Sequence, residues 1–168
     1  MFKINDYIMY GTVGVCKVID ITKEAIMNSA KIEYYVLNPI YSKYSKNTII
    51  KIPVDNKKIS MRKILSKDDV NSLINDIPNK ETLWIDDDKQ RNDQFKSILK
   101  GGSCDDLITL IRSIYLDKKK RKLDGKKVCK GDEEIMQTAE KLLNEEFATI
   151  LHIRLEEVKS YIKSHVPQ

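Results

Sequence analysis

The sequence predicts an α+β fold, with a small β domain in residues 1–64 and an all-α helical bundle in residues 65–168. The first part is rich in β-branched and aromatic residues and is interrupted by turn residues, as strands are. From Ser66 onward, apolar residues recur at the spacing of helices. A change of period at one point in the chain favours two separately folded domains.

The β domain is expected to be a small barrel. Four strands are expected, at residues 7–10, 13–21, 32–37 and 48–54. Turn residues such as Asn28-Ser29 separate them. In the last strand Ile50, Ile52 and Val54 share one face, while Lys51 points to the other. Closure into a barrel would leave such short strands with few unpaired edges.

The helical half carries clear start and stop signals. Ser66 and Asp69 form a capping-box pattern, and Pro78 ends the helix that follows. The next helix is expected to begin between Thr82 and Asp86 and to end at Gly101-Gly102. Three further helices are expected to start near Ser103, Gly131 and Leu155.

Charge is distributed in blocks. The net charge is +5, but residues 117–131 alone hold eight basic and two acidic side chains. Such a block attracts an anionic partner by its local field. Three scattered cysteines suit a reducing cytoplasm, and no stretch is apolar enough to span a membrane. We therefore expect a cytoplasmic, nucleoid-associated protein.

No catalytic constellation is apparent. His152 and His165 are not spaced as metal ligands are. The three consecutive aspartates at residues 86–88 would face different directions on a helix. Glycine-rich phosphate loops are absent from the sequence. We expect no enzyme, no metal and no cofactor.

The basic stretch is the strongest signal from the residues alone. Two interpretations remain open: a solvated loop between helices, and a surface that neutralises nucleic-acid phosphates. Because no aromatic residues lie between these basic residues, the stretch would bind the nucleic-acid backbone and would not recognise bases. Its members are Lys118, Lys119, Lys120, Arg121, Lys122, Lys126, Lys127 and Lys130.

Several segments together resemble the CarD/CdnL family of bacterial transcription regulators. No single motif is specific, but their order and spacing follow the family along nearly the whole chain. They are Asp6-Tyr7-Ile8-Met9-Tyr10, Tyr34-Tyr35-Val36-Leu37, Ile50-Lys51-Ile52-Pro53-Val54, Lys89-Gln90-Arg91, Lys100-Gly101-Gly102, Leu110-Ile111-Arg112-Ser113-Ile114 and Ala139-Glu140-Lys141-Leu142-Leu143.

The resemblance implies a Tudor-like, SH3-like barrel that binds the RNA polymerase β subunit. Lys51, with Ile52 and Pro53, is expected to contact polymerase. The helical domain would contact promoter DNA, through the backbone and minor groove, at the upstream edge of the melted bubble and modulate open-complex stability. Trp84, Lys89 and Arg91 join the basic stretch as expected DNA contacts. A monomer that does not bind membranes is expected.

The sequence departs from the family pattern at three places. Gly11 replaces a proline after the tyrosine, and Glu133-Glu134 replaces a basic pair. The family's tryptophan wedge falls on Asp88, whereas the only tryptophan here is Trp84. If the helix extends back through Trp84, the indole would share a face with the wedge position; otherwise it would pack against the bundle.

Two other functions remain open. One is a polymerase-bound adaptor whose helical domain binds a protein. The other is a free nucleic-acid-binding protein that uses the basic stretch alone.

Overall fold

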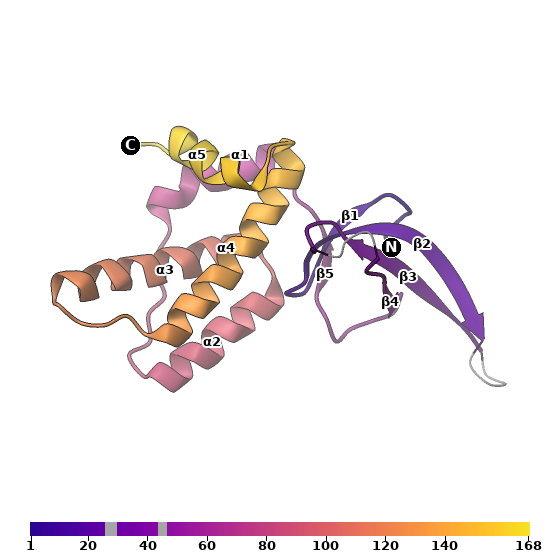
Figure 1. Ribbon diagram of the computed structural model, residues 1–168, viewed down its shortest axis with the longest axis horizontal. Helices are drawn as coiled ribbons and strands as arrows, with labels where there is room; N and C mark the ends of the chain where they lie inside the picture. The colour runs from indigo at the N-terminus through magenta and orange to yellow at the C-terminus, as the bar shows by residue number, and fades with distance from the viewer. Residues whose placement is uncertain (26–29, 44–46) are drawn as a thin grey trace. The chain divides into compact units, whose positions relative to one another are not determined.

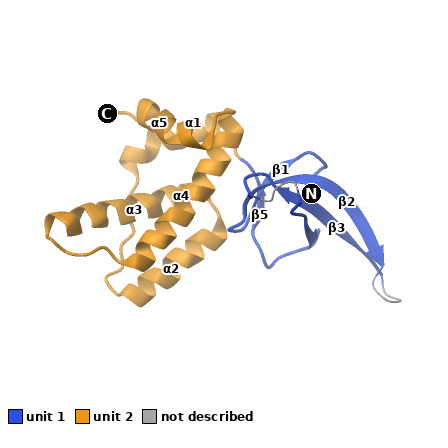
Figure 2. Cartoon of the chain, in the orientation of Figure 1, with its two compact units in different colours: residues 1–64 blue, residues 65–168 orange. Residues whose placement is uncertain are grey.

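The computed structural model describes residues 1–25, 30–43 and 47–168, so the expected turn at Asn28-Ser29 lies outside the described residues. The chain divides into two compact units, Met1–Ile64 and Leu65–Gln168 (Figure 1, Figure 2). A β-sheet forms the first unit and helices form the second, which confirms the α+β class.

The sheet has five antiparallel strands in the order β4-β3-β2-β1-β5. Their bounds are β1 Tyr7–Tyr10, β2 Gly14–Ala25, β3 Lys31–Pro39, β4 Ile50–Pro53 and β5 Met61–Lys63. The expected closed barrel is wrong: within the described residues, no ladder joins β4 to β5, and both remain edges. With four and three residues, these strands offer few backbone groups for a closing ladder. The shortness of β5 also explains why residue periodicity did not reveal it.

One face of the sheet carries the core of this unit. Ile8, Cys16, Val18, Tyr35 and Leu37 are buried together there. The pairing of β2 with β3 shifts between Val18 and Asp20, as at a β-bulge. This shift lets Val18 and Ile21 both contribute to the same core.

The helical unit consists of α1 Lys67–Asp76, the 3-10 helix η1 Ile77–Asn79, α2 Asp88–Gly101, α3 Cys104–Leu123, α4 Lys130–Leu151 and α5 Leu155–His165. Helices α2, α3 and α4 pack against one another, and α1 and α5 lie together at one end of α4 (Figure 1). Phe95, Leu107, Leu110, Leu142 and Phe147 are fully buried in this unit. None of the helices in the described part of the chain is long and apolar enough to cross a membrane.

Helix α2 begins later than expected. The predicted start between Thr82 and Asp86 is wrong, because the Asp87 side chain accepts a hydrogen bond from the Gln90 amide and caps a helix that starts at Asp88. The segment before α2 is not helical. It is bound to α3 by a hydrogen bond that the Leu83 amide donates to Ser113 Oγ at 2.8 Å.

Helix α3 continues through the basic stretch. The expected loop is therefore wrong for residues 118–122, which form the last turns of the helix. Lysine and arginine are good helix formers, and cations are stabilised near a helix C-terminus by its dipole. The turn that follows includes Gly125, at φ +67°.

The predicted capping box at the start of α1 is confirmed. Ser66 Oγ accepts a hydrogen bond from the Asp69 amide at 3.1 Å, and Asp69 Oδ2 accepts one from the Ser66 amide at 3.2 Å. The hydroxyl of Ser66 also donates to Asp69 Oδ2 at 2.6 Å. These hydrogen bonds from Ser66 lower the pKa of Asp69.

Substituting Ser66→Ala should lower the free energy of unfolding of the helical unit by about 1 kcal/mol, because one backbone donor of α1 loses its acceptor. The control is Ser72→Ala on the exposed side of the same helix, where alanine should stabilise by a few tenths of a kcal/mol. Denaturant titrations followed by Trp84 fluorescence measure both. Since the pKa of Asp69 is lowered in the folded state, the wild-type advantage should be complete above the ordinary aspartate pKa and shrink as the pH falls below it. A larger effect at acidic pH than at neutral pH would contradict this role.

Candidate functional site

The first candidate surface is on strand β4, at one edge of the sheet. Strand alternation turns Ile52 toward the core and leaves Lys51 exposed on the opposite face. Pro53 shares the face of Lys51 and pairs with Tyr34 of β3. Of the three expected polymerase contacts, Lys51 and Pro53 therefore point away from the core, and Ile52 helps to build it.

Lys51 is held in place by a carboxylate of the same sheet. Its Nζ donates to Glu24 Oε1 of β2 at 2.5 Å, and both side chains remain about half exposed. The hydrogen bond to Glu24 raises the pKa of Lys51, so the ammonium stays charged throughout the physiological range. A partner's carboxylate would have to compete with Glu24 for this cation.

The second candidate surface is the basic end of α3, defined as residues 118–122 with Lys126 and Lys127 of the following turn. Two of its cations are engaged within the protein: Lys118 pairs with Glu133 at 2.7 Å, and Arg121 pairs with Asp117 at 2.7 Å. Among the described residues, the remaining members have no ion pair and are exposed; they are Lys119, Lys120, Lys122, Lys126 and Lys127.

Arg91 was expected to contact DNA, but the structure buries it completely. Its Nε and Nη2 donate to the Asp132 carboxylate of α4 at 3.1 and 2.8 Å, and Nη2 donates to Asp88 at 2.7 Å. Nη1 donates to the Ile85 carbonyl at 2.8 Å. Because every nitrogen of the guanidinium is already engaged inside the fold, the expectation of a phosphate contact at Arg91 is wrong.

The Arg91–Asp132 pair was missed by reasoning from composition and motifs. Burial by itself would lower the pKa of Arg91, but the hydrogen bonds that it donates to Asp132 and Asp88 outweigh this effect and raise the pKa. The helical periodicity of the sequence did contain an indication of this pair, because Arg91 lies on the same helical stripe as Phe95 and Leu99. Asp132 likewise precedes Ile135 and Ala139 on the stripe of α4. Opposite charges on two apolar stripes predict a buried pair.

Trp84 lies in the extended segment before α2, so the expected alternative in which the helix extends back through it is wrong. Its half-buried ring lies 4.4 Å from the Arg91 guanidinium carbon and makes an edge contact with Phe95, with 6.2 Å between ring centroids. Asp88, at the family's wedge position, is paired with Arg91. Lys89 is exposed in the first turn of α2.

The described residues contain no group of three histidine, cysteine, aspartate or glutamate side chains arranged to hold a metal ion. Both candidate surfaces carry exposed cations, and the aromatic ring of Trp84 lies beside the second of them.

Comparison with known families adds the decisive observation for the first unit. Residues 2–65 match the family model described as the CarD-like/TRCF RID domain. The N-terminal unit is a CarD-like/TRCF RID domain. This match is consistent with the CarD/CdnL family and spans the whole sheet, including Lys51 in β4 of the RID domain. No curated protein matches the chain.

Replacing Arg91 with methionine should destabilise the helical unit by about 3–5 kcal/mol, because the Asp132 carboxylate would remain buried without its cation. The double variant Arg91→Met/Asp132→Leu should recover much of this loss, since no charge is then left buried. Denaturant unfolding of both variants, beside the exposed control Lys96→Met of the same helix, measures the difference. A single variant as stable as the control would show that the pair does not hold α2 to α4.

Proposed function

We propose that the protein is a transcription regulator that binds the RNA polymerase β subunit with its RID domain and promoter DNA with its helical unit. The observation that carries this proposal is the match of residues 2–65 to the RNA-polymerase-interacting domain of CarD-like proteins and transcription-repair coupling factors. Held near the upstream edge of the bubble, the helical unit would modulate the stability of the open complex.

The polymerase contact is proposed at the face of β4 that carries Lys51 and Pro53. Lys51 is an exposed cation, and a carboxylate of an acidic partner would take the place of Glu24 beside its ammonium group. Complementary charge across such an interface contributes specificity and speeds association.

The DNA contact is proposed at the basic end of α3. Its unpaired lysines are suited to phosphates, and each phosphate contact releases counterions. Lys119, Lys122 and Lys127 are exposed, and Lys89 of α2 adds a further exposed cation. Contact would be mainly with the backbone and with the minor groove. Because Trp84 is partly covered by Arg91 and Phe95, we propose that its ring does not act as a wedge in duplex DNA.

The two rival functions differ from this proposal in what each would bind. An adaptor would bind polymerase and leave promoter DNA unshifted, both alone and with holoenzyme. A free nucleic-acid-binding protein would shift DNA without binding polymerase. Gel-shift assays with and without holoenzyme therefore separate the three.

The Lys51→Glu substitution should weaken binding of the full chain to the polymerase β subunit by at least about tenfold, because it reverses the charge that the partner would meet. The control Glu24→Gln frees Lys51 from its internal partner and should leave binding unchanged or tighter. Pull-down of β-subunit fragments measures binding, and circular dichroism checks the fold. Unchanged binding of a folded Lys51→Glu variant would rule out this surface.

Neutralising Lys119, Lys122 and Lys127 together with glutamine should weaken binding to duplex promoter DNA and flatten its salt dependence. The slope of log affinity against log salt should fall by about 0.9 for each phosphate that the protein no longer neutralises. A matched variant with glutamine at Lys100, Lys159 and Lys163 removes the same charge from other exposed positions of the helical unit. If both variants change the slope equally, net charge and not the basic end of α3 accounts for the binding.

A further inference from the structure

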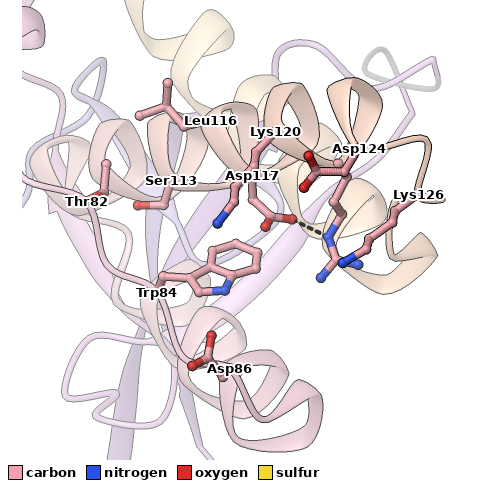
Figure 3. Close-up of a pocket in the computed structure, with 10 residues that line it drawn as sticks. Thr82, Trp84, Asp86, Ser113, Leu116, Asp117, Lys120, Asp124 and Lys126 are labelled. Carbon is pink, nitrogen blue, oxygen red and sulfur yellow. Dashed lines mark hydrogen bonds and ion pairs between the residues drawn. The ribbon is translucent and has the colours of Figure 1, made fainter.

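A cavity of about 520 Å³ opens in the helical unit beside the basic end of α3 (Figure 3). One wall is the segment with Thr82, Trp84 and Asp86. The other wall is one side of α3 with the turn that follows it, including Lys120 and Lys126. Its volume lies within the range of roughly 300–1,000 Å³ that is usual for small-molecule sites.

The indole of Trp84 projects into this cavity, between Asp86 on one side and Asp117 and Lys120 of α3 on the other (Figure 3). The ring is held from behind by two contacts: the Arg91 guanidinium at 4.4 Å and the edge of Phe95. Arg91 is itself fixed by Asp132. The cavity therefore contains a rigid aromatic surface on which a planar ring can stack.

Cations lie within reach of that surface. Lys120 and Lys126 both line the cavity, are exposed, and have no ion pair within residues 1–25, 30–43 and 47–168. The third cation, Arg121, is neutralised locally by Asp117. Asp124 is a further carboxylate of the lining, and among the described residues no ion pair joins it to Lys120 or Lys126. An anionic group that binds near Lys120 and Lys126 would therefore meet two ammonium groups to which no carboxylate of the described residues is bound.

The acidic side of the cavity suits hydrogen-bond donors. Asp86 lies beside the indole, on the side away from α3 (Figure 3). An ionised carboxylate only accepts hydrogen bonds, so it favours an exocyclic amino group or a sugar hydroxyl over a second anion. A ligand for this cavity therefore needs a flat ring, donors at one end and a phosphate at the other.

We propose that this cavity is a nucleotide-binding site, with the base stacked on Trp84 and the phosphate held by Lys120 and Lys126. Asp86 accepts a hydrogen bond from the base or the sugar. The shared chemistry is a nucleobase joined to a phosphate, and its source is either a free nucleotide or an unpaired nucleotide in a single strand. The proposal goes beyond the contact with duplex DNA, because it concerns only Lys120 and Lys126 of the basic end of α3, whereas Lys119, Lys122 and Lys127 lie outside the cavity.

Trp84 supplies the test, because it is the only tryptophan in the chain. The full chain is titrated with adenosine and guanosine monophosphates, with adenosine, and with a short single-stranded oligonucleotide of mixed sequence. The fluorescence of the Trp84 indole reports binding of each ligand beside it. Calorimetry detects any binding that leaves this fluorescence unchanged. A nucleotide should quench saturably and bind at least about tenfold more tightly than adenosine, because only the nucleotide carries the phosphate.

The double variant Lys120→Gln/Lys126→Gln should lose at least about tenfold in nucleotide affinity. Lys119→Gln/Lys122→Gln, with the same loss of charge outside the cavity, should bind as the wild type does. Binding of the monophosphates identifies a free nucleotide as a source, and binding of the oligonucleotide alone identifies an unpaired strand. Absence of saturable binding by every probe, equal affinity for adenosine and its monophosphate, or undiminished binding by Lys120→Gln/Lys126→Gln would overturn the proposal. Polymerase pull-down and duplex gel shifts are measured separately, so failure here is distinct from failure of the proposed function.

Discussion

The buried ion pair between Arg91 and Asp132 is the constraint on which the helical unit depends. Two opposite charges removed from water are tolerated only when geometry and further hydrogen bonds compensate for desolvation. Arg91 meets this condition by binding Asp132 of α4, Asp88 of α2 and the carbonyl of Ile85. One side chain thus joins two helices to the extended segment that precedes them. Its guanidinium then forms the surface behind Trp84 and fixes the orientation of that ring.

Helix propensity accounts for the second feature of this unit. Because residues 118–122 of the basic stretch continue α3, their cations are presented on a regular helical surface, whereas Lys126 and Lys127 lie in the turn that follows. Helical spacing then separates the cations into two groups. Lys120 and Arg121 line the cavity, whereas Lys119 and Lys122 lie outside it. Under the two proposals, the same stretch of chain would serve two anionic partners by different side chains.

The sheet imposes a simpler constraint on the RID domain. Successive side chains of β4 point to opposite faces of the sheet, so Ile50 and Ile52 pack in the core and Lys51 lies on the other face. Pairing with β3, which pairs in turn with β2, allows Glu24 to reach Lys51. The exposed cation is thus positioned by backbone register and by one carboxylate.

The sequence by itself determined the features that depend on local patterns. These are the α+β class, the strands from β1 to β4, the capping box of Ser66 and Asp69, and the outward face of Lys51. Each follows from side-chain period or from hydrogen bonds within a few residues of the chain. Tertiary structure decided whatever depends on residues far apart in sequence. It left the sheet open between β4 and β5, buried Arg91 through a carboxylate 41 positions away, and formed a cavity from Trp84 and α3. Such features arise from distant contacts, which leave only a faint trace in any one segment, as when Arg91 and Asp132 occupy otherwise apolar stripes.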